Sequence, residues 1–451
     1  MKLFALPEDA RFKNKEIILF ILPIFFEQVI ISLMGIIDTY MVSYLGETAV
    51  AGVSLALSID QFVKNVSIAL ATGGSVVVSQ YIGARNIKEA SRALKTNIQV
   101  IFLISTIACI FFVAFRDILL SFLFGTVEEG VMNSSKEFFS INALSYPFLA
   151  LYNCGSASFR ATGNTRIPFM ASICMMVINV ALKYIFIFVF KLGVSGAALS
   201  TLAAYIITGT VQVIMHCSHK NRIVVIKLFK PEWYGGLIGR ITKIALPNGI
   251  ENGLFNLGAL ILQRLVSTLG TASIAANALA SNISPLTYAL GSSFTMAIIT
   301  FVGQCCGAGD IKGAKFYTKH ILKLDYAAMI VNAALAILFT APLVRMYGLS
   351  EEATGYAINI LYVYFFMSAL FYPMSFALPN ALRGTGDTVF TMTVSALSMF
   401  LFRIIMAYVF VYVFKTGVIA IWYAMVLDWI IRSLVFVLRY KSGKWEKNHV
   451  I

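Results

Sequence analysis

Polar and charged side chains inside long apolar stretches are the residues of this sequence that could do chemistry. Asp38, Lys183 and Thr201 each stand about seven residues from the end of such a stretch, which is roughly 10 Å at ~1.5 Å of helical rise per residue. Asn179 stands one helical turn deeper than Lys183. A carboxylate, an amide and a hydroxyl at matched depth can supply oxygen ligands to a small cation or exchange a proton. We therefore predict that Asp38, Asn179 and Thr201 form a cation or proton site and that Lys183, at the same depth, belongs to the coupling residues.

Two glutamates hold matching positions in the two halves of the chain. Glu27 follows Pro23 by four residues, and Glu251 follows Pro247 by the same spacing. Proline bends a helix because it lacks an amide hydrogen. The glutamates could face a cavity as a pair and attract cationic substrates or carry protons from the cytoplasmic side. Alternatively, each could hydrogen-bond to the backbone groups that its proline leaves free.

Other charges in apolar stretches are spaced for pairing. Asp60 and Lys64 are four residues apart, as are Asp428 and Arg432, and an acid four residues before a base is the favourable order for a helical ion pair. Pairing lowers the cost of burying either charge, so we interpret both pairs as structural. Arg403 lies in the middle of a stretch in the second half of the chain and could be a fixed positive charge there.

The elements that carry these residues must be membrane helices. The chain has 451 residues, of which 59% are hydrophobic and only 12% are charged, whereas soluble domains carry roughly 25% charged residues. A helix needs ~20 apolar residues to cross a bilayer. We expect an all-α membrane protein with twelve transmembrane helices near residues 17–44, 49–78, 96–115, 138–158, 168–190, 194–215, 244–267, 274–302, 321–344, 356–379, 388–414 and 418–438.

The net charge of +14 could suggest nucleic acid as a partner, but its placement argues for membrane topology. With the N-terminus inside, 25 of the 35 Lys and Arg residues fall in the tails and inner loops, and 5 fall in the other loops. Cytoplasmic loops carry such an excess of basic residues. We therefore expect a multi-pass protein of the plasma (inner) membrane with both termini in the cytoplasm, in contact with anionic lipids and not with nucleic acid.

An internal repeat divides the chain. With a shift of 224 residues, the segment QYIGARNIKEA from Gln80 aligns with QCCGAGDIKGA from Gln304. RATGNT from Arg160 aligns with RGTGDT from Arg383 after a one-residue slip. Each half has six expected helices, so the halves are parallel repeats, which in transporters flank the binding site. The predicted domains are an N-lobe at 1–216 with helices 1–6, a cytoplasmic loop at 217–243, and a C-lobe at 244–451 with helices 7–12 and a basic tail.

The segments DTYMV from Asp38, GGSVVVSQYIGARN, RATGNT and GVSGAALST resemble the MATE family (multidrug and toxic compound extrusion) over nearly the whole chain. PIFFEQ, PNGIENGLF and DWIIR are similar to a bacterial branch. The resemblance implies an exporter that exchanges amphipathic or cationic compounds for H⁺ or Na⁺. It also implies that Asp38, Asn179 and Thr201 form the N-lobe cation site.

The sequence departs from the family pattern at three positions. Many relatives carry an acid where this chain has Lys183, and a lysine could replace a bound Na⁺ by pairing with Asp38. Some relatives carry an acid in helix 10 where this chain has Tyr372, and the glutamate of helix 7 in other branches corresponds to Phe255. These departures favour proton coupling in the N-lobe, and leave Glu27, Glu251, Tyr372 and Arg403 as candidates for lining the substrate cavity.

We therefore expect a secondary antiporter that acts by alternating access. We predict a small-molecule substrate, coupling to H⁺ (or alternatively Na⁺), no other cofactor or bound metal, no ATPase subunit, and a monomer. The alternative is a flippase for a lipid-linked or amphipathic lipid substrate on a related fold, which should need a basic cavity. An enzyme is not expected, since the HExxH, GxSxG and P-loop patterns are absent from the sequence.

Overall fold

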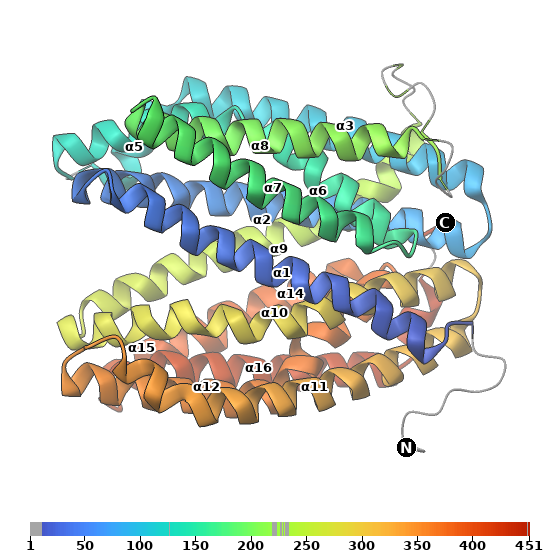
Figure 1. The fold of residues 1–451 in the computed structure, drawn as a ribbon. Coiled ribbons are helices and arrows are strands. Elements are labelled where there is room, and N and C mark those ends of the chain that lie inside the picture. Colours follow the sequence, from blue (N-terminus) through green and yellow to red (C-terminus); the bar gives the residue numbers. More distant parts are fainter. Residues whose placement is uncertain are drawn as a thin grey trace. The chain divides into compact units, whose positions relative to one another are not determined.

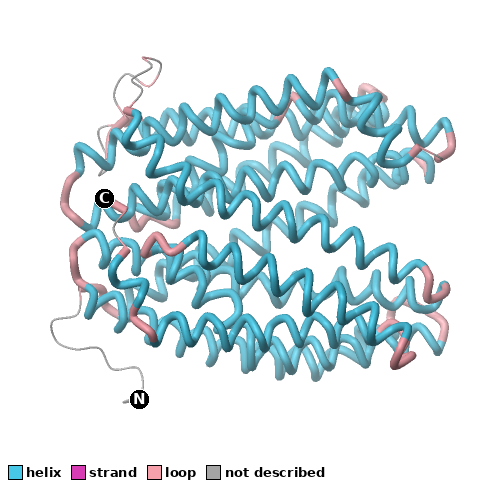
Figure 2. The backbone as a smooth tube through the Cα atoms, turned by 180° about the vertical axis from the view of Figure 1, so that it is seen from behind, coloured by secondary structure: helices cyan, strands magenta, loops and turns pink. Residues whose placement is uncertain are grey.

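The computed structural model of the protein describes residues 11–125, 127–218, 223–225, 228, 230, 234–448 and 450–451, together with the main chain only at Leu286. All regular elements among these residues are helices (Figure 2). Ten of the described helices are long and apolar enough to cross a membrane. The remaining two expected spans correspond to Gly235–Ser267 and to a pair of shorter helices, Glu129–Ala143 and Tyr146–Ala161. The prediction of an all-α membrane protein is confirmed.

The described part of the chain folds into two compact units. The N-lobe unit lies within residues 29–249, and the C-lobe unit consists of residues from 11 to 28 and from 250 to 450. Both divisions fall inside helices, namely α1 (Asn14–Ser43) and α9 (Gly235–Ser267). In the C-lobe unit, Ile17 and Ile24 of α1 are fully buried in one core with Phe301. The first helix of each repeat is therefore shared between the units.

The N-lobe unit is a bundle in which α2, α3 and α6 contact one another, α8 packs on α6, and α7 lies along α8 (Figure 1). The run expected as one span at 138–158 is broken at residues 144–145, because α6 begins with a proline at position 147 that cannot donate to the preceding turn. The helices of this unit are α2 (Glu47–Gly83), α3 (Ile87–Ala114), α4 (Arg116–Phe124), α5 (Glu129–Ala143), α6 (Tyr146–Ala161), α7 (Arg166–Tyr184), the π-helix η2 (Ile185–Val189) and α8 (Gly193–His216).

The C-lobe unit has the equivalent helices and two further π-helical segments. Its elements are α10 (Thr271–Gly307), α11 (Ile311–Arg345), α12 (Glu351–Tyr372), η3 (Pro373–Ala377), α13 (Leu378–Gly384), α14 (Thr388–Ser398), η4 (Met399–Ile405), α15 (Met406–Tyr412), α16 (Ile419–Lys441) and the short η5 (Lys444–Lys447). A π-helix widens one turn and re-aims the side chains on it, and such turns are common at functional sites.

The internal repeat is visible in the backbone as well as in the sequence. Helices α2 and α10 both have 37 residues and both start after a glycine with positive φ, Gly46 or Gly270. The next helix in each half begins with a side-chain cap. Asn86 Oδ1 accepts a hydrogen bond from the amide of Glu89 at 3.1 Å, and Asp310 Oδ1 accepts one from that of Gly313 at 2.7 Å. Capping of this kind satisfies an amide that the helix leaves free.

Candidate functional site

An ion pair joins α1 and α7 in the N-lobe unit. The Lys183 Nζ lies 2.5 Å from Asp38 Oδ1. The lysine side chain is 3% exposed and that of the aspartate 26% exposed, so one partner is enclosed and the other remains open. The sequence predicted that these residues share a site. Their contact makes Asp38 the partially accessible member of a buried pair, which is the position a proton-exchanging carboxylate needs.

The other two residues of the predicted site contact each other. Asn179 Nδ2 donates to Thr201 Oγ1 at 3.2 Å, and Thr201 Oγ1 also lies 3.2 Å from the carbonyl of Ala197. Asn179 is fully buried, and its Oδ1 has no hydrogen-bond partner within the described part of the chain. An acceptor oxygen is therefore available on α7, as a small hydrated ion or a protonated group would require.

A second ion pair lies in the same unit. Lys64 Nζ is 2.7 Å from Asp60 Oδ2, and Asn142 Nδ2 donates to Asp60 Oδ1 at 2.8 Å. Asp60 is 2% exposed, so both of its oxygens are bound in a buried position. The sequence correctly predicted the Asp60 to Lys64 pair but gave it a separate, structural role.

A cavity brings the two ion pairs together. Its volume is about 60 Å³, which is room for a few water molecules but not for a drug-sized compound. Two carboxylates and two ammonium groups face it, so its walls carry no net charge. Asn179 lies behind this cavity, through its bond to Thr201. The described lining residues are Met34, Asp38, Thr39, Val42, Val50, Val53, Ser54, Leu57, Asp60, Lys64, Phe138, Asn142, Lys183, Thr201 and Tyr205.

The C-lobe unit contains a larger cavity of about 420 Å³, within the range of small-molecule sites. Its walls are mostly aromatic and aliphatic, and Arg403 of η4 is the charged residue among them. Of the four predicted cavity candidates, Arg403 therefore lines a pocket. The lining residues are Phe255, Ala259, Leu262, Gln263, Val266, Asn277, Ser281, Ser284, Pro285, Tyr288, Tyr364, Phe376, Arg403, Ile421, Trp422, Met425 and Trp429.

Tyr372 is placed behind the wall of the C-lobe cavity. Its ring stacks on Phe376 with centroids 4.8 Å apart and meets the edge of Tyr288 at 5.5 Å. Both of those residues line the cavity. Gly291 leaves space for the Tyr372 ring, which a Cβ at that position would overlap. Tyr372 therefore supports the aromatic wall instead of facing the cavity.

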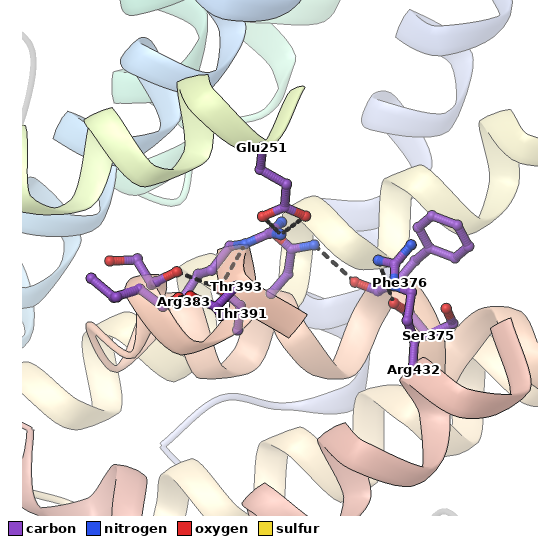
Figure 3. A network of polar contacts seen from close by, with 10 residues as sticks. Glu251, Ser375, Phe376, Arg383, Thr391, Thr393 and Arg432 are labelled. Carbon is purple, nitrogen blue, oxygen red and sulfur yellow. Dashed lines mark hydrogen bonds and ion pairs between the residues drawn. The ribbon is translucent and has the colours of Figure 1, made fainter. Parts of the chain in front are cut away.

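Glu251 is held in a polar network and does not line either described cavity. Arg383 Nη2 donates to both Glu251 carboxylate oxygens at 2.6 Å, and Arg383 Nη1 donates to Asn380 at 3.2 Å (Figure 3). The side chains are 7% and 15% exposed. Glu27 is also buried in the C-lobe unit, at 2% exposure. The Arg383 guanidinium balances the Glu251 charge, so the negative field expected from a pair of free glutamates is reduced.

The sequence interpretation missed one buried acid. Asp325 of α11 is fully buried, and neither carboxylate oxygen has a hydrogen-bond partner among the residues that the structure describes. A single aspartate inside the apolar run 321–344 was the signal that could have drawn attention to it, because ionisable residues in transmembrane segments usually have a function or a partner.

Comparisons with known proteins agree with this architecture. The MatE family model matches residues 23–185 and 247–409, two segments that start 224 residues apart. A probable multidrug resistance protein NorM of Thermotoga maritima is 26% identical, over 97% of this chain and 94% of its own length. The uncharacterized transporter YisQ of Bacillus subtilis is 25% identical, over 94% and 93% respectively. The fold is similar to that of a MATE crystallised in complex with MaL6, with a TM-score of 0.88, 19% identity, and coverage of 96% of this chain and 97% of that one.

Proposed function

Because the chain belongs to the MATE family of multidrug efflux transporters, we propose that it exports amphipathic or cationic small molecules in exchange for protons, with Asp38 as the coupling residue. The observation that carries this proposal is the 2.5 Å ion pair between Asp38 and Lys183 beside a small internal cavity. The cavity has room for water but not for a drug, so it suits the coupling ion better than the exported compound.

Protonation of Asp38 changes which conformation is favoured in this mechanism. A proton on the carboxylate removes the counter-charge of Lys183, whose side chain is 3% exposed. Leaving a buried charge without its partner costs ~3–5 kcal/mol, so the protonated protein favours a different arrangement of α1 and α7. A coupling ion shifts a conformational equilibrium only by its differential affinity for the two states. Loss of the ion pair provides that difference, and alternating access follows from it.

Sodium is the less suitable coupling ion for this site. The Lys183 ammonium occupies the position next to Asp38 that a bound Na⁺ would take, and Lys64 holds the neighbouring Asp60 in the same way. A sodium ion would have to displace a lysine without gaining net negative charge in the cavity. A proton needs no such vacancy, because it binds to a carboxylate oxygen directly.

Transport in proteoliposomes tests this proposal. Ethidium or norfloxacin efflux is measured under an imposed pH gradient or Na⁺ gradient, for the wild type and Asp38→Asn. We expect efflux driven by the pH gradient alone, and its loss in Asp38→Asn with the protein still folded and inserted. The matched control is Asp117→Asn, an exposed acid on α4 whose pKa is lowered by its hydrogen bond to Lys136. Gradient-driven efflux by Asp38→Asn at the wild-type rate would rule out the assignment.

The proposal includes a location and an orientation. The protein acts as a monomer in the plasma (inner) membrane. Both termini lie in the cytoplasm, because the basic residues concentrate in the tails and in every second loop. A fluorescent protein fused to the C-terminus should fluoresce and a periplasmic phosphatase at the same position should be inactive; the opposite pattern would reverse the orientation.

A lipid flippase is the alternative function. A lipid-linked substrate with a pyrophosphate needs a basic cavity, and the positive charge of Arg403 in the C-lobe cavity favours this alternative to that extent. The cavity volume of about 420 Å³ matches a drug-sized molecule, so we prefer small-molecule export. Failure of both gradients to drive efflux, together with translocation of labelled lipid, would support the flippase.

A further inference from the structure

The C-lobe cavity has the wrong charge for a site that binds only cations. Arg403 is the one lining residue of that cavity with a charged side chain, within the part of the chain whose side chains are described. Its Nε is buried and has no hydrogen-bond partner among those residues. A buried hydrogen-bond donor without an acceptor is costly, and more so when it is charged. Arg403 therefore lacks a hydrogen-bond acceptor, and a ligand in the cavity could supply one.

The charges around Arg403 do not balance within the protein. Asp428 and Arg432 of α16 act on Arg403 through their charges. The Asp428 carboxylate accepts a hydrogen bond from Ser398 Oγ at 2.5 Å, and its other oxygen lies 3.9 Å from Arg432 Nη1. Among the described charges that act on Arg403, one aspartate is thus the counter-charge for two arginines, which leaves one positive charge uncompensated. An anionic group in the cavity would compensate it.

Arg432 does not compete for that anion. It is 2% exposed, its Nη2 donates to the carbonyl of Ser375 at 3.1 Å, and its guanidinium lies 4.8 Å from the ring centre of Phe376 (Figure 3). It is absent from the cavity lining, whereas Arg403 is part of it. The planar fork of an arginine guanidinium matches the two oxygens of a carboxylate.

The aromatic walls of the cavity favour a ligand with a planar ring. Six aromatic rings line the cavity, and stacked or edge-to-face contacts with a planar ring are favourable at such a surface. Tyr364 is fixed against two of the others, with ring centres 5.6 Å from Trp422 and 5.7 Å from Trp429. The six are Phe255, Tyr288, Tyr364, Phe376, Trp422 and Trp429.

We propose that the C-lobe cavity binds planar aromatic compounds that carry a carboxylate, with Arg403 paired to the carboxylate and the aromatic side chains stacked on the ring. This inference deepens the proposed function by naming the chemical class of one group of substrates, and it rests on that function for their export.

The test compares two ligands of the same ring system and opposite charge, 9-anthracenecarboxylate and 9-(aminomethyl)anthracene. Binding to the full-length protein in phosphatidylcholine nanodiscs is followed by energy transfer from tryptophan, since two of the four tryptophans of the chain line the cavity. We expect the carboxylate to bind at least about tenfold more tightly, in line with hydrogen bonds to a charged group. Equal affinities, or tighter binding of the amine, would overturn the proposal.

Two substitutions of Arg403 test whether this residue causes the preference for the carboxylate. Arg403→Met should remove the preference for the carboxylate, and Arg403→Lys should keep part of it because the charge remains. Arg345→Met, at an exposed position at the end of α11, makes the same change in net charge and should leave the preference intact. A preference that survives Arg403→Met would also overturn the proposal. If Arg403→Met does not fold, the ligand pair on the wild type and Arg403→Lys still decides the question.

Binding at equilibrium separates this inference from the proposed function. The nanodisc measurement uses no gradient, so it does not depend on coupling through Asp38. Tight binding of the carboxylate without proton-driven efflux would leave the inference standing and reject proton antiport. Proton-driven efflux of ethidium without a preference for the carboxylate would do the reverse.

Discussion

Asp325 is a buried acid in the C-lobe unit whose carboxylate should lower the stability of the protein. Its carboxylate is fully buried, and both oxygens lack a hydrogen-bond partner in the described part of the structure. Burial of an unsatisfied polar group costs ~1–3 kcal/mol. We therefore predict that Asp325→Leu, which is similar in size, raises the free energy of unfolding by about 1–2 kcal/mol. The measurement is the midpoint of thermal unfolding of the purified protein in detergent.

Asp428 provides the matched control, because it is an equally buried aspartate with partners on Ser398 and Arg432. Asp428→Leu leaves Arg432 without its acid, and breaking a buried pair costs ~3–5 kcal/mol. The two substitutions should thus shift the unfolding midpoint in opposite directions. A fall with Asp325→Leu as large as that with Asp428→Leu would mean that Asp325 has an important partner. A rise in stability with a loss of transport would give Asp325 a functional role.

Lys183 is the ion-pair partner of Asp38, with its ammonium 2.5 Å from the carboxylate. In the proposed mechanism a proton on Asp38 acts by breaking this pair. Lys183→Met lacks the pair from the start, so the dependence of proton-driven efflux on pH should weaken. The measurement is the efflux rate as a function of pH in proteoliposomes, with Lys136→Met of the surface pair with Asp117 as control. An unchanged profile would mean that Lys183 has a purely structural role.

The helices α9 and α2 pack closely, and adding a single methyl group between them tests this packing. A Cβ on Gly73 would lie 2.5 Å from the Ala245 Cα, closer than real contacts allow, so the helices would have to separate. We predict that Gly73→Ala lowers the free energy of unfolding by about 1–3 kcal/mol. The same change at Gly249 meets only Val66 at 3.9 Å and should be neutral or stabilising. Equal unfolding midpoints for the two variants would show that the helices can separate freely.

The sequence predicted the helices and their order, because hydropathy and the internal repeat can be determined without knowing how the helices pack. It did not predict the π-helices, such as η4 around Arg403, since their wider turn depends on how neighbouring helices pack. The break before α6 could have been inferred from Pro147. Within the site, the depth argument placed Asp38 and Lys183 together, but only the fold could bring Asp60 to the same cavity.

At the scale of the whole molecule, the two repeats have diverged in what they enclose. The N-lobe unit holds a cavity of about 60 Å³ with two ion pairs, and the C-lobe unit holds one of about 420 Å³ with an unbalanced Arg403. A small neutral site suits a proton, whereas a large aromatic site suits an organic compound. We therefore propose that one lobe serves coupling and the other serves binding.

This division predicts that the two functions separate by mutation. Residues without shared partners usually contribute additively to free energies, and Asp38 and Arg403 share none among the described contacts. Asp38→Asn should therefore bind 9-anthracenecarboxylate within about twofold of the wild type while losing proton-driven export. Arg403→Met should lose that binding and keep the pH-dependent change in hydrogen exchange of α1 and α7, which Asp38→Asn should lack. If either substitution abolished both properties in a folded protein, coupling and binding would belong to one shared site and the division between the lobes would be wrong.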